Sequence, residues 1–191
     1  MSALPPWYPD PDETKAAPMP LLVVQGLLNT RDLEHQTDLL GEKDAARAWL
    51  EAAGLVPDGS PFESGDLELV RAVREGIRAL LAPDQHAHDS AELDPLRELA
   101  ETHRPRLTVD DGGMLGLSGG PDATLSDRLF GLLLIIHDAQ QEGMWTRLKA
   151  CANPDCGWVF YDRSRNHQGN WCDMAVCGNR MKNRNLRARR R

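Results

Sequence analysis

Four cysteines lie in the last 41 residues of this 191-residue chain, and the preceding residues contain none. Cys151 and Cys156 form one pair and Cys172 and Cys177 a second, with four residues inside each pair and 15 between the pairs. Two cysteine pairs on either side of a loop can fold four thiolates around one ion, as in structural zinc sites. The spacing therefore predicts a metal-closed module at the C-terminal end.

The redox compartment decides whether such cysteines bind a metal or pair as disulfides. Residues 1–20 lack the basic and apolar regions of a secretory signal, and no stretch approaches the roughly 20 apolar residues that span a membrane. We therefore expect a cytoplasmic protein with no membrane partner, in which thiols stay reduced. This favours one structural Zn²⁺ over the alternatives, which are paired disulfides or free thiols. The predicted ligands are Cys151, Cys156, Cys172 and Cys177.

Charge is distributed unevenly along the chain. Residues 1–146 carry 11 Lys/Arg against 26 Asp/Glu, a net −15, whereas residues 147–191 carry 11 Lys/Arg against 3 Asp, a net +8. Six of the 13 prolines lie in the first 20 residues, which is typical of an extended, weakly ordered segment. We therefore predict an extended N-terminal arm over 1–19, an α-rich acidic domain over 20–146 and a basic zinc-finger domain over 147–191.

Apolar residues repeat with helical spacing through most of the acidic domain. The predicted helices cover residues 42–53, 64–81, 91–103 and 124–149, and residues 21–30 form a short helix or a buried strand. Two runs with period-two spacing flank Asp111-Gly112-Gly113, which predicts a β-hairpin over 106–118. The fold class is thus mostly α (α+β): a multi-helical domain with one β-hairpin, then a small zinc finger built from a knuckle, a hairpin and a helix.

Two of these helices carry further expectations. In the helix over 64–81, Arg71, Arg74 and Arg78 fall opposite the apolar stripe. The helix over 124–149 is apolar around its circumference, which is typical of the central helix of a domain. It ends almost directly before the first cysteine, so we expect the cysteine module to be held against the body without a flexible linker.

The residues around the cysteines predict the structure of the module. Residues 158–161 read as a strand, 162–169 as a polar turn, and Asp173 onward as a helix. The inward positions of that helix are expected to be Met174, Cys177, Met181 and Leu186.

Basic side chains gather on the same module. Four thiolates and Zn²⁺ carry a net charge of about −2, which alone favours nearby cations. Arg180, Arg184, Arg187 and Arg191 recur at helical spacing, with no acidic residue after Asp173. Such a stripe is typical of phosphate contact; the alternatives are solubility, an acidic protein partner or docking on the acidic domain. The predicted nucleic-acid-binding residues are Arg163, Arg165, Arg180, Lys182, Arg184, Arg187, Arg189 and Arg190.

The cysteine motif resembles a known zinc finger. Cys151-x4-Cys156-Gly-Trp-x-Phe-Tyr-Asp, followed by Trp171-Cys-x-Met-x-x-Cys177-Gly-Asn-Arg180, closely resembles the CGNR-type zinc finger over roughly residues 147–190. Upstream, the runs Leu28-Asn29-Thr30 and Ala48-Trp49-Leu50 resemble the ABATE domain that usually precedes this finger. The resemblance implies a family of bacterial, stress-linked transcription regulators. Its members often have two arginines before the tryptophan, where this chain has Gly169 and Asn170, so two phosphate contacts would be missing.

Catalytic motifs are absent from the sequence. It contains no nucleophile elbow, no Walker loop and no His-Glu-x-x-His, so we expect no enzyme activity. The features together predict a cytoplasmic DNA-binding transcriptional regulator whose α-rich domain senses a small-molecule effector or forms a homodimer. The alternative is a zinc-stapled interaction module whose basic end binds RNA or an acidic protein.

Overall fold

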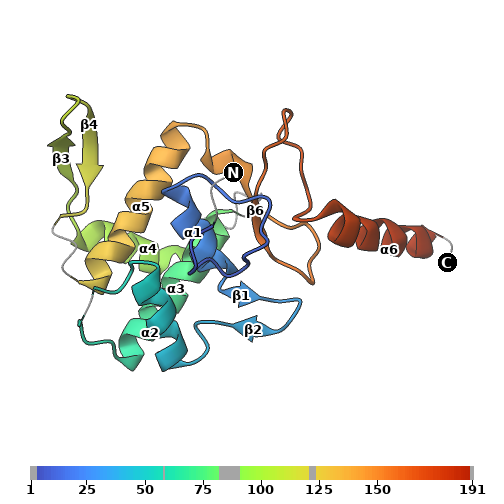
Figure 1. The fold of residues 1–191 in the computed structure, drawn as a ribbon, viewed down its shortest axis with the longest axis horizontal. Coiled ribbons are helices and arrows are strands. Elements are labelled where there is room, and N and C mark those ends of the chain that lie inside the picture. Colours follow the sequence, from blue (N-terminus) through green and yellow to red (C-terminus); the bar gives the residue numbers. More distant parts are fainter. Residues whose placement is uncertain (1–3, 58, 82–90, 121–123, 190–191) are drawn as a thin grey trace.

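A computed structural model of the chain describes residues 4–57, 59–81, 91–120 and 124–189, with all of their side chains except those of Asn185 and Arg189. The N-terminal body is a group of helices that contains α1 (Leu21–Asn29), α2 (Lys43–Ala52), α3 (Ser64–Leu80), α4 (Asp94–Thr102) and α5 (Leu125–Gln141) (Figure 1). α2 packs against α3, and α4 packs against α3 and α5. Residues 21–29, for which the sequence left helix and strand open, are thus a helix, and α3, α5 and β6 (Val159–Tyr161) pack around it.

The helix boundaries follow from local capping. Glu63 and Asp66 form a capping box at the start of α3, and Thr124 and Asp127 form another at the start of α5. The helix predicted over 124–149 is too long, because α5 ends at Gln141. Gly143 has a φ of +72°, a left-handed conformation that ends the helix. The chain then forms a 3₁₀ turn, η3 (Trp145–Arg147), and strand β5 (Leu148–Ala150).

Strands occur as three antiparallel hairpins in the described residues. β1 (Arg31–Asp32) pairs with β2 (Thr37–Asp38), β3 (Arg106–Val109) with β4 (Leu115–Ser118), and β5 with β6. The β3–β4 hairpin lies where the turn signal predicts it, whereas the short β1–β2 hairpin was not predicted. A turn of π-helix, η4 (Met174–Gly178), leads into α6 (Asn179–Arg189), and η2 (Ala91–Leu93) precedes α4. The fold class is confirmed: mostly helical, with small hairpins and a C-terminal cysteine cluster.

None of the helices described by the structure has both the length and the apolar character needed to cross a lipid bilayer.

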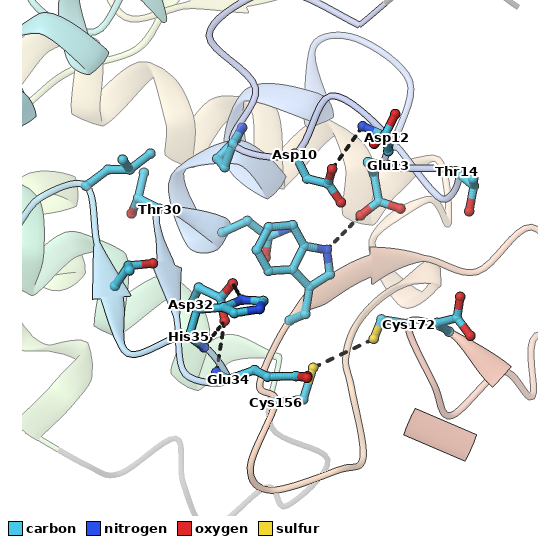
Figure 2. Close-up of a pocket in the computed structure, with 16 residues that line it drawn as sticks. Asp10, Asp12, Glu13, Thr14, Thr30, Asp32, Glu34, His35, Cys156 and Cys172 are labelled. Carbon is cyan, nitrogen blue, oxygen red and sulfur yellow. Dashed lines mark hydrogen bonds and ion pairs between the residues drawn. The ribbon is translucent and has the colours of Figure 1, made fainter. Parts of the chain in front are cut away.

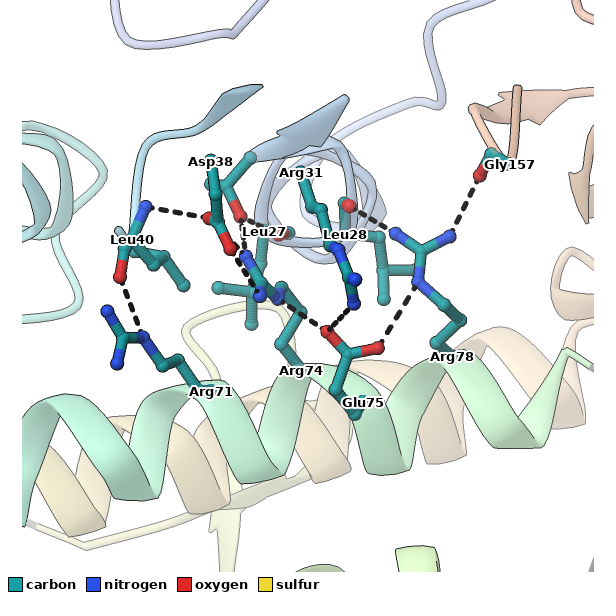
Figure 3. A network of polar contacts seen from close by, with 11 residues as sticks. Leu27, Leu28, Arg31, Asp38, Leu40, Arg71, Arg74, Glu75, Arg78 and Gly157 are labelled. Carbon is teal, nitrogen blue, oxygen red and sulfur yellow. Dashed lines mark hydrogen bonds and ion pairs between the residues drawn. The ribbon is translucent and has the colours of Figure 1, made fainter. Parts of the chain in front are cut away.

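The arginine face of α3 is covered by the β1–β2 hairpin (Figure 3). Arg71 donates to the carbonyl oxygens of Leu40 and Gly41 at 2.7 and 2.6 Å. Arg74, only 3% exposed, donates to both carboxylate oxygens of Asp38 at 2.6 and 2.8 Å. Arg74 is therefore a buried residue on the side of α3 opposite its apolar stripe, where Asp38 supplies the counter-charge that a buried guanidinium requires, while Arg71 and Arg78 are partly exposed.

This ion pair makes the stability of the protein depend on pH. Burial alone would raise the pKa of Asp38, but the hydrogen bonds and charge of Arg74 outweigh burial and lower it. A carboxyl whose pKa is lower in the folded state stabilises the fold above its unfolded pKa of about 4, and this contribution is lost as the pH falls through the folded-state pKa.

Replacing Asp38 with asparagine is therefore expected to lower the unfolding free energy by about 1–3 kcal/mol at neutral pH, because the buried Arg74 loses the carboxylate that accepts two of its hydrogen bonds. Urea unfolding at several pH values would measure it, and the difference from wild type should shrink as the pH falls below about 4. Asp138→Asn, at an exposed position of α5, is the control. A difference that stays constant with pH would contradict the assignment.

Candidate metal centre

The four cysteine sulfurs converge at the junction between the body and α6. All four Sγ atoms lie within 4.8 Å of one another. The Sγ atoms of Cys156 and Cys172 are 3.7 Å apart, as are those of Cys172 and Cys177. A tetrahedron with Zn–S bonds of about 2.3 Å places its sulfurs about 3.8 Å apart, whereas a disulfide needs about 2.05 Å. The donor set and its spacing fit one structural Zn²⁺ with four thiolate ligands.

Short turns aim the sulfurs at a common point. The amide N–H of Cys156 donates to the carbonyl of Asn153 at 3.0 Å, and Gly157 then reverses the chain with a φ of +62°. The amide N–H of Cys151 donates to the carbonyl of Trp158 at 2.8 Å, which closes the first knuckle onto β6. On the other side, Cys177 lies in η4, so the last ligand belongs to the turn from which α6 grows.

The thiols are packed closely enough to perturb one another. Hydrogen bonds from the Cys156 and Cys172 thiols lower the pKa of Cys151 to about 2. The contact with Cys151 raises the pKa of Cys156 to about 12 and also raises that of Cys172. One thiolate is thus easily held, but further thiolates repel one another unless a divalent cation neutralises them. Bound Zn²⁺ would supply that neutralisation and no other chemistry.

A buried carboxylate orders the loop between the two cysteine pairs. Asp162 accepts hydrogen bonds from Lys149 Nζ at 2.9 Å and from the amides of Ser164 and Gly169 at 3.0 and 2.7 Å. Burial would raise the pKa of Asp162, but these donors lower it overall. A Cβ on Gly169 would lie 2.9 Å from the Asp162 carboxylate. The glycine therefore has a structural role, and an arginine in its place would displace Asp162.

Buried amides of α1 fasten the module to the body. Asn29 pairs with both backbone groups of Val159, accepting from its N–H and donating to its C=O, each at 2.8 Å. Gln25 donates to the same carbonyl at 3.0 Å. Arg78 of α3 donates to the carbonyl of Gly157 at 2.8 Å (Figure 3). The module is thus held against the body at the residues that follow its first cysteine pair.

The N-terminal segment fastens the module from the other side. Glu13 accepts a hydrogen bond from the Trp158 indole at 2.7 Å. Lys15 Nζ donates to the carbonyl of Trp171 at 2.7 Å and lies over the Phe160 ring. Tyr8, on the same segment, is buried. The expectation of a weakly ordered arm is therefore wrong for residues 4–19, which pack between the body and the module.

These fastening residues were missed by the sequence reasoning, although a signal was present. Gln25 and Asn29 are single amides in an apolar run, and a buried amide needs several hydrogen-bond partners. Such residues indicate a polar contact to another part of the chain, but not which part. Glu13 and Lys15 had no comparable signal, because charged residues in a proline-rich segment are usually solvated.

An acid-lined cavity of about 500 Å³ lies beside the metal centre (Figure 2). Its acidic lining residues are Asp10, Asp12, Glu13, Asp32, Glu34 and Asp173. Trp158, Cys156 and Cys172 contribute to its wall, and no Lys or Arg is among the described residues that line it. The accumulated negative charge disfavours phosphate here, so a nucleic acid would have to approach the module from another side.

The predicted nucleic-acid-binding residues have different surroundings. Arg180, Arg184 and Arg187 line one hollow along α6. Arg180 pairs with Glu34 at 2.7 Å and Arg184 with Asp155 at 3.3 Å.

The remaining candidates divide into three kinds. Arg163 donates to the carbonyl of Ala16 at 2.6 Å, which is a structural contact. Arg165 and Lys182 are exposed. The side chain of Arg189, and Arg190 and Arg191 as a whole, lie outside the described residues. Contact with nucleic acid stays a prediction for all of them.

The expectation of an inward apolar side on the last helix is wrong for two residues. Met174 is 51% exposed and Leu186 is 49% exposed, whereas Cys177 is buried. For Leu186 the reason is that α6 projects away from the rest of the molecule (Figure 1), whereas Met174 lies in the η4 turn before α6. A core cannot form along a helix that has no neighbouring element.

One curated relative is an enzyme. A dihydroxy-acid dehydratase of Methanoregula boonei (strain DSM 21154 / JCM 14090 / 6A8) is 27% identical over 164 residues, covering 73% of this chain and 29% of that protein. The chain thus spans less than a third of the length of this relative.

Two protein families match consecutive parts of the chain. Residues 147–190 match the CGNR zinc finger, and this range covers all four cysteines and the whole of α6. Residues 23–141 match the ABATE family, described as "Putative stress-induced transcription regulator", which covers the body from α1 to the end of α5. The chain therefore belongs to the ABATE family and carries a CGNR zinc finger at its C-terminal end.

Proposed function

We propose that the chain is a DNA-binding transcription regulator, in which the metal centre fixes the direction of a basic helix that contacts DNA phosphates. One observation carries this proposal: α6 contains no acidic residue and projects away from an acidic body (Figure 1). Membership of a regulator family with a zinc finger supports it.

The start of α6 depends on the metal centre. Asp173 caps the η4 turn by accepting the N–H of Val176 at 2.8 Å, and Asn179 donates to the carbonyl of Ala175 at 3.0 Å. An isolated helix of about 12 residues is marginal in water, and α6 has 11. Metal binding by Cys177 is therefore expected to order the helix and to present its basic side chains.

Phosphate contact would use the hollow formed by Arg180, Arg184 and Arg187. The two ion pairs at this hollow are largely exposed, and exposed pairs contribute only about 0–1 kcal/mol. A DNA phosphate can replace Glu34 or Asp155 at small cost. The acid-lined cavity on the other side of Glu34 would keep the duplex on the α6 side.

Replacing Arg184 and Arg187 together with alanine is expected to weaken duplex binding and to reduce the slope of log K against log salt by about 2, since each phosphate contact contributes about 0.9. Fluorescence anisotropy with duplex DNA at several salt concentrations would measure it. Arg31→Ala with Arg97→Ala, which removes two exposed arginines of the body that also form ion pairs, is the matched control. Equal slopes for the two double variants would contradict a role for α6.

The second candidate function is a zinc-stapled interaction module that binds RNA or an acidic protein. The observation that favours it is the extensive fastening of the finger to α1 and to residues 13–16. Competition between duplex DNA, RNA and an acidic peptide in the same assay separates the candidates. If zinc-loaded protein binds no duplex even at low salt, the regulator proposal fails.

We further propose that the chain is not an enzyme and works in a reducing compartment such as the cytoplasm. Its matched families are of regulator and zinc-finger type, and the similarity to the dehydratase covers under a third of that enzyme. Thiolate ligands require reduced cysteines. We also propose that the chain divides into a regulatory body and a finger that begins at residue 147. Binding of a small-molecule effector by the body stays a prediction.

A further inference from the structure

The β3–β4 hairpin has one entirely apolar face. Leu107 pairs with Leu117 and Val109 with Leu115, and residues opposite each other in an antiparallel pair point to the same side. Leu107, Val109 and Leu115 are 70%, 65% and 66% exposed, and Met114 beside them is 69% exposed. Thr108 and Gly116 occupy the opposite, polar face. Among the described residues, no hydrophobic cluster includes the apolar face.

The hairpin is a well-formed element despite this exposure. The Asp110 carboxylate accepts the amides of Gly112 and Met114 at 2.8 and 2.9 Å. Gly113 completes the turn with a φ of +80° and donates to the carbonyl of Asp110 at 2.9 Å. A two-stranded hairpin is marginally stable in water unless a face is covered, and contiguous exposed apolar patches mark interaction surfaces.

Charges at the two ends of the hairpin are complementary. Asp110 and Asp111 form the tip, whereas Arg104 lies just before the base, and all three are exposed. Arg106 pairs with Ser118 and therefore shares the polar face with Thr108. If a second copy packs face to face with its hairpin running in the opposite direction, the acidic tip of each hairpin lies beside the positively charged base of the other hairpin. The apolar side chains between the two ends would pack against the same apolar side chains of the other copy. This satisfies the self-complementarity that a two-fold interface requires.

We propose that this face is a homodimer interface, formed by two hairpins packed antiparallel through Leu107, Val109, Leu115 and Leu117. The face itself carries no charge, so the occupant must be apolar where it touches the strands and oppositely charged at both ends. A second copy meets both conditions. The hairpin and α6 lie at opposite ends of the molecule (Figure 1), so the dimer would leave both basic helices accessible. The interface does not depend on the proposed function.

Light scattering coupled to size exclusion, over a range of protein concentrations, tests the proposal on the zinc-loaded full chain. We expect wild type to reach twice the monomer mass of 21.2 kDa. Val109→Glu and Leu115→Glu should each weaken dimerisation by at least about a hundredfold, because each buries an unpaired charge. Thr108→Glu adds the same charge on the opposite face and should remain dimeric. A monomeric wild type, or a dimer unaffected by both apolar-face variants, would overturn the proposal.

A charge-swap series tests the antiparallel arrangement itself. Arg104→Glu and Asp111→Arg should each weaken the dimer several-fold, and the double variant should recover wild-type affinity, because the swapped charges meet only across the interface. Failure of the double variant to recover would overturn this arrangement. Hydrogen exchange on wild type removes any dependence on variant folding: amides of 106–118 should become better protected as concentration rises, and unchanged protection there would count against the interface.

Discussion

Replacing Cys177 with serine is expected to reduce bound zinc from about one ion per chain to almost none. Serine is a poor zinc ligand, and the remaining three sulfurs leave the tetrahedron open. Structural zinc in finger peptides contributes roughly 10–16 kcal/mol of apparent binding free energy, so the finger should lose its fixed structure. Elemental analysis of protein purified without chelator gives the zinc content, and circular dichroism with a melting curve gives the loss of structure.

Ala152→Ser is the matched control for this variant, because it adds a hydroxyl at an exposed position beside Cys151 and should keep its zinc. Full zinc occupancy in the Cys177 variant would rule out the four-sulfur site. Wild type with well under one zinc per chain would rule out zinc as the resident metal. Loss of DNA binding alone would not test the metal site, since the finger could bind metal without binding DNA.

The second large effect is expected from Asn29→Ala. This change leaves the buried N–H and C=O of Val159 without the partner that satisfies both, and each unsatisfied backbone group costs about 1–3 kcal/mol. Gln25 still reaches the carbonyl, so the expected loss of unfolding free energy is about 2–4 kcal/mol. Urea unfolding measures the loss, and hydrogen exchange should show weaker protection of 157–161, where the module meets α1.

Asn183→Ala, on the exposed surface of α6, controls for the change of residue type and should alter stability by less than about 0.5 kcal/mol. If the Asn29 variant is as stable as this control, the hydrogen bonds to Val159 do not fasten the finger. The two predictions are independent, because the Asn29 variant keeps all four cysteines and should retain its zinc.

Local signals account for the parts of the fold that could be predicted from the sequence. The apolar period of residues 64–81 predicted α3, and Asp111-Gly112-Gly113 predicted the β3–β4 hairpin, because turns and helices depend on neighbouring residues. The end of α5 was misplaced, since the apolar period continues past the point where Gly143 reverses the backbone. The apolar period of a helix indicates which of its faces is buried, but not where a glycine ends the helix.

Contacts between distant residues could not be predicted in the same way. Arg74 reads as a surface residue until Asp38, 36 positions away, is seen to receive its guanidinium. The proline-rich start reads as an extended, weakly ordered arm until Lys15 is seen to contact the carbonyl of Trp171. In the candidate site, the cysteine spacing indicated the donors, but which side of the finger faces the body followed only from Asn29 and Val159.

The acid-lined cavity has a consequence for how long the metal stays bound. Because Cys156 and Cys172 form part of its wall, anything that reaches these sulfurs through the cavity crosses a negative field. Cations are concentrated there and anions are repelled, more strongly at low ionic strength. Anionic thiols and carboxylate chelators would therefore strip zinc through this opening more slowly than neutral ones of equal affinity. The carboxylates that line the cavity are thus expected to slow the loss of zinc to anionic agents, an effect that the four sulfurs alone would not provide.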